Sequence, residues 1–302
     1  MDSTSSKWEV MVEARAAAVL TARFNGSGNF FFTGGEDRVI RLWDTRNGNL
    51  LTSFPELELE HEIRDVCITK DDSKLSSCGG DEQVLYWDLS TQCLVRKFGG
   101  HNDEVNAVKF NESGSVIASG DSCVRLWDCR SHTSQPIQIF DTFNNSVTSL
   151  YVRTTEIFAG SLDGSVQKFD LRNKTRLFFD LGSPVKCISM GNTGTCIVAS
   201  RLDSTFQLLH VKPRSIRKGG TYKGHTCESS KVLGCCFTKD TTHVVGGSED
   251  GRIFIWDLVS KKVVSKIDAH SSAVTSVDYH PTDDCMVSAS MDGSVVLWKD
   301  PM

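Results

Sequence analysis

The chain has 302 residues, of which 39% are hydrophobic and 24% are charged, and its net charge is −5. This composition provides enough apolar material for a large core and excludes a disordered or collagen-like chain. Because 38 Asp and Glu outnumber 33 Lys and Arg, a protein that wraps nucleic acid over its whole surface is also excluded, although a local basic patch is not.

The start of the sequence indicates where the protein is found. Residues 1–6 carry neither the basic nor the apolar region of a secretion signal, and no window approaches 18 consecutive apolar residues. The 11 cysteines include no Cys-x-x-Cys pair, as expected of reduced cysteines that pack in a core. We therefore expect a flexible N-terminus at 1–6 and a protein of the cytoplasm and nucleus that has no contact with a membrane.

The first predicted strand, residues 7–13, precedes seven similar units. Each unit contains a short β-like run that ends in a large apolar residue, and an aspartate lies six positions before that residue. The run-ending residues are Trp43, Trp87, Trp127, Phe169, Leu209, Trp256 and Trp298, and the aspartates are Asp37, Asp81, Asp121, Asp163, Asp203, Asp250 and Asp292. Seven units separated by six spacings of 40 to 47 residues indicate one repeat architecture and not two separate domains.

The units consist of strands. In chain order, the clearest predicted strands are residues 39–43, 83–87, 105–110, 253–256, 274–279 and 295–298. These runs are rich in β-branched and aromatic residues, and several of them follow Gly or Asp turns. No segment shows sustained helical periodicity. The sequence therefore predicts an all-β chain with about four strands in each unit.

Several units carry the same short motifs. Four units end in Trp-Asp, at residues 43–44, 87–88, 127–128 and 256–257, and two begin with Gly-His, at 100–101 and 224–225. These motifs resemble those of the WD-repeat family, and the resemblance implies one seven-bladed β-propeller over residues 7–302. The expected blades are 14–55, 56–98, 99–140, 141–179, 180–222, 223–266 and 267–302. Phe169-Asp170, Leu209-His210 and Trp298-Lys299 depart from the family motif.

The last unit is too short to form a complete blade. Only residues 299–302 follow Trp298, which is less than the five or so residues of an average strand. Because a propeller is stable only as a closed ring, another segment has to supply the missing strand. We predict that residues 7–13 form the outer strand of the last blade.

Histidine, aspartate and tryptophan recur together in four units. The family resemblance implies that they form a structural hydrogen-bond network within each blade, and an active site would not be built four times. The four sets are His61, Asp81 and Trp87; His101, Asp121 and Trp127; His225, Asp250 and Trp256; and His270, Asp292 and Trp298. Replacing one such aspartate, as in Asp250→Ala, is expected to cost about 1 to 3 kcal/mol.

Motifs of enzyme and metal chemistry are missing from the sequence. It contains no Gly-x-Ser-x-Gly, P-loop or His-Glu-x-x-His motif. Cys129 and His132 have the spacing of zinc ligands, but no second pair accompanies them. We therefore expect no catalytic residues, no metal site and no cofactor.

Two groups of residues are candidates for partner binding. In the family, the position before the turn aspartate often faces the binding surface; Leu162, Leu202 and Met291 occupy it here, and Phe143 could extend the same patch. These side chains could equally pack against a neighbouring blade. Arg214, Arg217 and Lys218 belong to the densest basic cluster, which is either a solvated hairpin at a blade's outer edge or a contact for an acidic partner or RNA.

Several runs between about residues 94 and 290 resemble one member of the family more closely, among them 105–112 and 182–184. This resemblance implies a non-catalytic scaffold that is a monomer within larger complexes. Its expected partners are proteins, either splicing factors of the spliceosome, which we favour, or components of a mitogen-activated protein kinase cascade. Contact with RNA is expected to be weak and indirect. The alternative function is a peptide-reading substrate receptor or a chromatin-associated adaptor.

Overall fold

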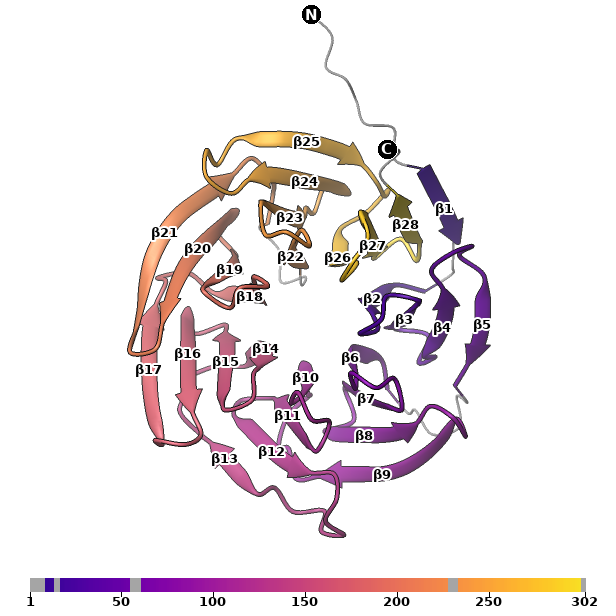
Figure 1. Cartoon of the computed structure of the whole chain (residues 1–302), viewed down its shortest axis with the longest axis vertical. Coiled ribbons are helices and arrows are strands. Elements are labelled where there is room, and N and C mark those ends of the chain that lie inside the picture. The colour runs from indigo at the N-terminus through magenta and orange to yellow at the C-terminus, as the bar shows by residue number, and fades with distance from the viewer. Residues whose placement is uncertain (1–8, 14–16, 55–60, 228–232, 300–302) are drawn as a thin grey trace, which may run out of the picture.

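The computed structural model describes residues 9–13, 17–54, 61–227 and 233–299. These residues form 28 strands in seven four-stranded antiparallel sheets, which are arranged as blades around a central channel (Figure 1). The prediction of an all-β, seven-bladed propeller is therefore confirmed. Within these residues there is no helix of the length and apolarity needed to cross a membrane. The predicted flexible segment 1–6 and residues 7–8 of the predicted first strand lie outside the described residues.

Each of the first six blades follows chain order from the channel to the rim. Blade 1 contains β2 (Val19–Phe24), β3 (Phe30–Gly35), β4 (Arg41–Asp44) and β5 (Leu50–Ser53). Blade 2 contains β6 (Ile63–Ile68), β7 (Lys74–Gly79), β8 (Gln83–Asp88) and β9 (Cys93–Gly99). Blade 3 contains β10 (Ala107–Phe110), β11 (Val116–Gly120), β12 (Val124–Asp128) and β13 (Gln138–Phe140).

The remaining blades lie on the other side of the ring (Figure 1). Blade 4 contains β14 (Val147–Val152), β15 (Glu156–Ser161), β16 (Ser165–Asp170) and β17 (Thr175–Asp180). Blade 5 contains β18 (Val185–Met190), β19 (Cys196–Arg201), β20 (Thr205–Lys212) and β21 (Ser215–Lys223). Blade 6 contains β22 (Cys235–Phe237), β23 (His243–Gly247), β24 (Arg252–Asp257) and β25 (Val263–Asp268). Blade 7 contains β26 (Val274–Tyr279), β27 (Cys285–Ser290), β28 (Val295–Lys299) and β1 (Glu9–Glu13).

The N-terminal strand closes the ring. β1 pairs antiparallel with β28, with Met11 opposite Leu297, and takes the outermost position in blade 7. The strand predicted at 7–13 therefore completes the last blade as expected, and the first and last strands, β1 and β28, lie in the same blade (Figure 1). This pairing removes the gap that the short last unit would otherwise leave at the rim.

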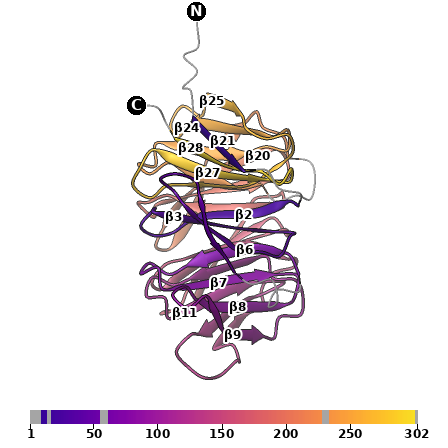
Figure 2. The same cartoon turned by 90° about the vertical axis from the view of Figure 1, so that its right-hand side faces the viewer.

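The strands run across the thickness of the ring, from one face to the other (Figure 2). Because neighbouring strands are antiparallel, the turn between the second and third strands and the connection to the next blade lie on one face, which we call the mouth face. The first and last hairpin turns of each blade lie on the opposite face, which we call the turn face. The seven repeated aspartates, which lie between the second and third strands, are therefore on the mouth face.

The hydrophobic core lies between neighbouring blades. Trp127 packs against residues of blade 2, Trp298 against blade 6 and Trp43 against blade 7. Phe169 and Leu209, which replace the tryptophan in blades 4 and 5, occupy the same position against blades 3 and 4. Each repeat therefore buries the large apolar residue at this position of its third strand against the preceding blade, which explains why a single repeat could not be stable alone.

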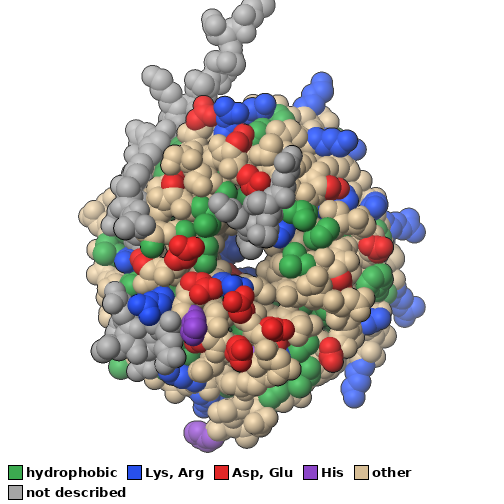
Figure 3. Space-filling view, turned by 180° about the vertical axis from the view of Figure 1, so that it is seen from behind, with side chains coloured by type: hydrophobic (Ala, Val, Ile, Leu, Met, Phe, Trp, Pro, Cys, Tyr) green, Lys and Arg blue, Asp and Glu red, His purple; other side chains and the backbone are tan. Residues whose placement is uncertain are grey.

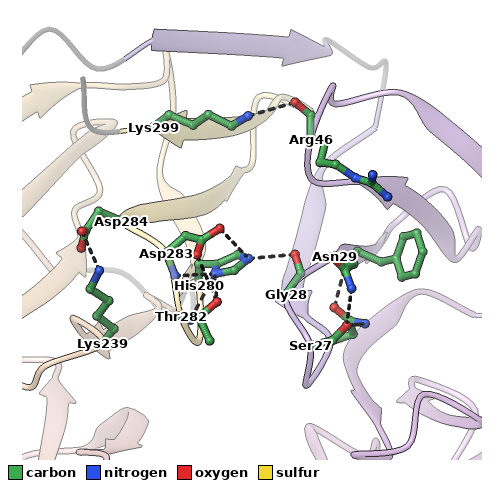
Figure 4. A network of polar contacts seen from close by, with 12 residues as sticks. Ser27, Gly28, Asn29, Arg46, Lys239, His280, Thr282, Asp283, Asp284 and Lys299 are labelled. Atoms are coloured by element: carbon green, nitrogen blue, oxygen red, sulfur yellow. Dashed lines mark hydrogen bonds and ion pairs between the residues drawn. The ribbon is translucent and has the colours of Figure 1, made fainter. Parts of the chain in front are cut away.

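The seam between blades 7 and 1 also has polar contacts on the turn face (Figure 4). The buried His280 lies 2.9 Å from the carbonyl oxygen of Gly28 through Nε2, and its Nδ1 accepts hydrogen bonds from the amides of Asp283 (2.8 Å) and Thr282 (3.2 Å). Since Nδ1 accepts, Nε2 carries the proton that is donated to Gly28. Gly28 has a φ of 77°, and a Cβ there would lie 2.1 Å from His280 Nε2, so this contact requires glycine.

Candidate interaction sites around the central channel

A channel of about 1020 Å³ runs along the axis of the ring and opens on the mouth face. Its wall consists of residues of the inner strands, such as Arg23 of β2, Asp65 of β6 and Lys109 of β10. Residues of the connections between blades, such as His61 and Glu104, line its opening. The channel therefore brings together side chains that are far apart in the sequence.

Asp65 joins three blades inside the channel. Its carboxylate lies 3.6 Å from Nε of Arg23 in blade 1 and 2.6 Å from Nζ of Lys109 in blade 3, and it accepts a hydrogen bond of 3.2 Å from the amide of Val108. Asp278 of blade 7 accepts a hydrogen bond of 2.9 Å from an amide of blade 1 in the same way, and burial raises its pKa. These interior carboxylates hold neighbouring blades together.

The opening on the mouth face is predominantly acidic (Figure 3). Arg64 pairs with Glu62 at 2.9 Å and with Glu104 at 2.6 Å, while Glu36 and Asp103 are exposed on the lining of the same opening. Leu162 and Met291 also line the channel and are half-buried. The opening thus combines carboxylates with two apolar side chains.

The structure separates the residues that we predicted to bind a partner. Leu162 and Met291 come together at the channel, and Leu202 is half-buried outside its lining. Phe143 is buried against Phe169 in the core between blades 3 and 4, with ring centroids 6.0 Å apart. Our expectation that Phe143 extends an exposed patch therefore has to be corrected.

The predicted basic cluster lies elsewhere on the molecule. Arg214, Arg217 and Lys218 are exposed on or beside β21, the outermost strand of blade 5. They are on the rim of the ring and not at the channel (Figure 1). The two predicted groups of partner-binding residues therefore belong to two separate surfaces.

Blade 3 contains a continuous hydrogen-bond network. Trp127 Nε1 donates to Ser119 Oγ at 2.7 Å, and Ser119 Oγ is hydrogen-bonded to His101 Nε2 at 2.5 Å. Nδ1 of His101 lies 2.9 Å from Asp121 Oδ1 and 2.8 Å from Nη1 of Arg125. Burial alone would raise the pKa of Asp121, but the hydrogen bond from His101 and those from two amides lower it. Arg125 also donates to Asp121, at 2.8 Å.

Blade 7 has the same network with one extra link. Trp298 donates to Ser288 at 2.8 Å, and Ser288 lies 2.7 Å from His270 Nε2. Nδ1 of His270 contacts Ser294 at 2.5 Å, and Ser294 in turn donates to Asp292 at 2.5 Å. Burial lowers the pKa of His270 to about 4, while Asp292 opposes this shift. The histidine is therefore neutral near pH 7.

Blades 2 and 6 place their histidines differently. His61 is exposed and lines the channel, while Trp87 donates to Ser77 at 3.0 Å. In blade 6, both ring nitrogens of the buried His225 lack a hydrogen-bond partner among the described residues, and its ring stacks on Phe206 with centroids 4.1 Å apart. Burial lowers the pKa of His225 to about 4. The four predicted sets therefore form two extended networks and two other arrangements.

The second strand of each blade decides which arrangement forms. The hydroxyl that accepts from the tryptophan comes from Thr33, Ser77, Ser119 and Ser288. The corresponding residue is Gly246 in blade 6, opposite Phe254 of β24, so Trp256 donates instead to the carbonyl oxygen of Lys223 at 3.0 Å. Sequence reasoning missed these hydroxyl residues, although most of them lie ten positions before the tryptophan and could have been found by that spacing.

Cys129 and His132, which have the spacing of zinc ligands in the sequence, differ in their exposure. Cys129 is buried and His132 is exposed. In the part of the chain that the structure describes, no three His, Cys, Asp or Glu side chains form a group that could hold a metal ion.

Comparison with known proteins gives two kinds of match. The family model described as "WD domain, G-beta repeat" matches residues 11–44, 92–128, 217–257 and 261–299. WD repeat domain-containing protein 83 is 42% identical in Homo sapiens and 41% identical in Rattus norvegicus, and each match covers 94% of this chain and 89% of the relative. Pre-mRNA-splicing factor cwf17 of Schizosaccharomyces pombe is 26% identical over 93% of this chain and 84% of the relative.

Proposed function

The chain belongs to the WD-repeat family, among the homologues of WD repeat domain-containing protein 83, and from this premise we propose that it is a non-catalytic scaffold for protein–protein interactions. Propeller domains of this family typically mediate such interactions. The runs between residues 94 and 290 resemble the same relative, which is also called mitogen-activated protein kinase organiser 1. The scaffold would act as a monomer within larger complexes, in the cytoplasm and nucleus.

The proposed partners are splicing factors of the spliceosome, components of a mitogen-activated protein kinase cascade, or both. The similarity to a relative named as a pre-mRNA-splicing factor supports the first group. The alternative name of the more similar relatives supports the second. We propose the scaffold role for the whole ring and splicing complexes as its first partners.

One observation carries the proposal. Residues from at least four blades, including Glu36, Glu104, Leu162 and Met291, converge at the opening of the channel on the mouth face. Apolar anchors that are surrounded by charged groups are typical of protein interaction sites. The alternative of a peptide reader with an aromatic cage has less support, because no Phe, Tyr or Trp lines the channel within the described residues.

Affinity purification with mass spectrometry tests this proposal. The native protein would be compared with Leu162→Asp and Met291→Asp, and with Val259→Asp as a control, because Val259 is 84% exposed and does not line the channel. We expect splicing factors or kinase-cascade components with the native protein and the control, and at least a tenfold loss with the two channel variants. Circular dichroism would show that each variant is folded.

Two results would contradict the proposal. Partners that are neither splicing factors nor kinase-cascade components would refute the proposed complexes. Equal recovery of partners with folded Leu162→Asp, Met291→Asp and native protein would refute the channel opening as the site of contact.

A further inference from the structure

Charge is distributed unevenly around the ring. Residues 141–266, the predicted blades 4 to 6, contain 18 Lys and Arg against 11 Asp and Glu, whereas the rest of the chain contains 15 against 27. The net charge of −5 therefore conceals a positive sector and a strongly negative one. In Figure 3, Lys and Arg side chains gather along the right-hand rim, where these blades lie in that view.

Ten described cations of this sector share two properties: they are exposed, and none forms an ion pair with a described residue. One of them, Lys266 of β25, lies over the ring of Phe254, and the other nine form a separate group. They lie on the outer strands of blades 4 and 5 and in the last hairpin turns of blades 4 to 6, and we call them the basic rim. They are Lys174, Arg176, Lys212, Arg214, Arg217, Lys218, Lys223, Lys261 and Lys262. Other cations of the same blades are paired, for example Lys168 with Glu156 at 2.5 Å and Arg252 with Asp268 at 2.7 Å.

Contacts between the blades make the basic rim continuous. Nζ of Lys168 in blade 4 donates to the carbonyl oxygen of Pro213 at the tip of the β20–β21 hairpin at 3.2 Å, and β17 contacts β21. On the other side, the side chain of Lys261 in blade 6 lies over Gly220 of β21, where a Cβ would be 2.3 Å from Lys261 Cε. The cations of three blades therefore form one surface with the hairpin at its centre.

The basic rim fits a polyanion whose charges are spread along its length. The β20–β21 hairpin contains no exposed large apolar residue, so its centre lacks the anchor on which protein–protein affinity usually depends. On the neighbouring strand β17, Phe178 is 56% exposed and, two positions from Arg176, lies on the same face of that strand. Arg176 pairs with Phe169, which packs against blade 3, so this face of β17 is turned towards blade 3 and away from the hairpin. An exposed ring next to an unpaired cation is typical of surfaces that bind single-stranded nucleic acid by phosphate contacts and base stacking.

We propose that the basic rim binds the phosphate backbone of single-stranded RNA directly and without sequence preference. This goes beyond the weak and indirect contact that the sequence suggested. The choice of RNA over DNA rests on the proposed role in splicing. The contact with a phosphate backbone rests only on the exposed, unpaired cations of the basic rim. The negative remainder of the ring would repel RNA and confine it to this rim.

Fluorescence anisotropy with a labelled 20-nucleotide oligouridylate tests the proposal at 50 to 200 mM salt. We expect a dissociation constant of about 10⁻⁴ to 10⁻⁶ M near physiological salt, with log K falling by about 0.7 per phosphate contact for each unit of log salt. Arg214→Ala/Arg217→Ala/Lys218→Ala should weaken binding at least tenfold at 50 mM salt and reduce this slope by about 2. Phe178→Ala should weaken binding about fivefold or more and leave the slope unchanged.

The matched control removes the same charge from another part of the ring. Arg46→Ala/Lys70→Ala/Arg130→Ala deletes three exposed cations of blades 1 to 3, two of which are 78% exposed. We expect its affinity and slope to remain within twofold of the native protein. An equal loss in this control would show that only net charge matters and would overturn the proposed site.

Two further probes identify the kind of ligand. Equal binding of a 20-nucleotide oligothymidylate would support the backbone contact and show that the sugar is not read. Failure to bind oligouridylate, or equally strong binding of a 20-residue polyglutamate, would overturn the proposal; the second result would assign the rim to an acidic protein segment. Partner capture by the channel variants measures the proposed scaffold role separately.

Discussion

Blade 3 and blade 6 carry the same three motif residues and use them differently. In blade 3, Trp127, Ser119, His101 and Asp121 form a chain of hydrogen bonds in the core. In blade 6, His225 is equally buried, yet it stacks on Phe206 of the neighbouring blade. The two blades differ at one position of the second strand: blade 6 has Gly246 where blade 3 has Ser119. Because Gly246 has no side chain, the ring of Phe206 can fill the space beside it.

This difference shows that the motif alone does not specify the interaction. A buried imidazole has to be satisfied either by hydrogen bonds or by favourable packing of its neutral ring, since burial penalises its charged form. The hydroxyl on the second strand allows the first solution, and its loss together with an aromatic residue from the next blade allows the second. The four predictions below test this account, beginning with the largest effect.

The largest difference in stability is expected between variants of the turn aspartates in blades 3 and 6, Asp121 and Asp250. Asp121→Ala removes the carboxylate that pairs with the buried Arg125 and His101, and we expect a loss of about 3 to 5 kcal/mol in the free energy of unfolding. Asp250, whose side chain is 34% exposed, accepts from Arg252 at the surface. We therefore expect Asp250→Ala to cost under about 1 kcal/mol, less than the sequence suggested. Urea denaturation would measure both, and equal losses would contradict the distinction between the two blades.

The second largest loss of stability is expected when the hydroxyl of Ser119 in blade 3 is removed. Ser119→Ala leaves the buried indole of Trp127 and Nε2 of His101 without their common partner, and we expect a loss of about 3 kcal/mol. Ala159→Ser, in the blade where Phe169 replaces tryptophan, is the control because no indole there needs an acceptor. If Ser119→Ala were as stable as the native protein by urea denaturation, the network would contribute nothing to stability.

Restoring the motif in blade 6 should not stabilise it. A Cβ at Gly246 would lie 2.1 Å from the ring of Phe206, so we expect Gly246→Ser to cost about 2 kcal/mol by overpacking. In combination with Phe206→Ala, the clash is absent, and the double variant should lose less than the sum of the two single variants. Strict additivity in this double-mutant cycle would show that Gly246 and Phe206 are not coupled.

Acid should weaken the protein through its buried histidines. His225 and His270 have pKa values lowered to about 4 from an unfolded value of 6.5, so the unfolded state binds more protons between these pH values. Their contribution is fully present above pH 6.5 and is lost as the pH falls towards 4. From pH 7.5 to 5.5, each histidine should account for a loss of about 1 kcal/mol.

Variants separate the contribution of one histidine. His225→Phe should remove about 1 kcal/mol of the pH dependence, measured as the change in unfolding free energy between pH 7.5 and 5.5. His61→Phe is the control, because His61 is exposed at the channel. If His225→Phe kept the pH dependence of the native protein, as His61→Phe is expected to, burial of His225 would not be a cause of that dependence.

Much of the fold could be predicted, and less of the candidate sites. Regular spacing of the turn aspartates gave the number of blades, and the short last unit gave the role of the N-terminal strand. Exposure was harder to predict. Leu162 and Phe143 are both large and apolar and both lie in loops of the mouth face, yet one lines the channel and the other is buried against Phe169. Side chains of the adjacent blade decide between these outcomes, and a repeat motif does not contain them.

By itself, the sequence determined the strands, their repetition and the closed ring, because alternation, turn residues and a constant period are local properties of the chain. Only the tertiary structure decided the charge of each surface and the state of each histidine. Asp65 meets Arg23 and Lys109 from two other blades, and His225 meets Phe206 across a seam. Such contacts depend on which blades become neighbours and on the water that they exclude, and these follow only when the ring is closed.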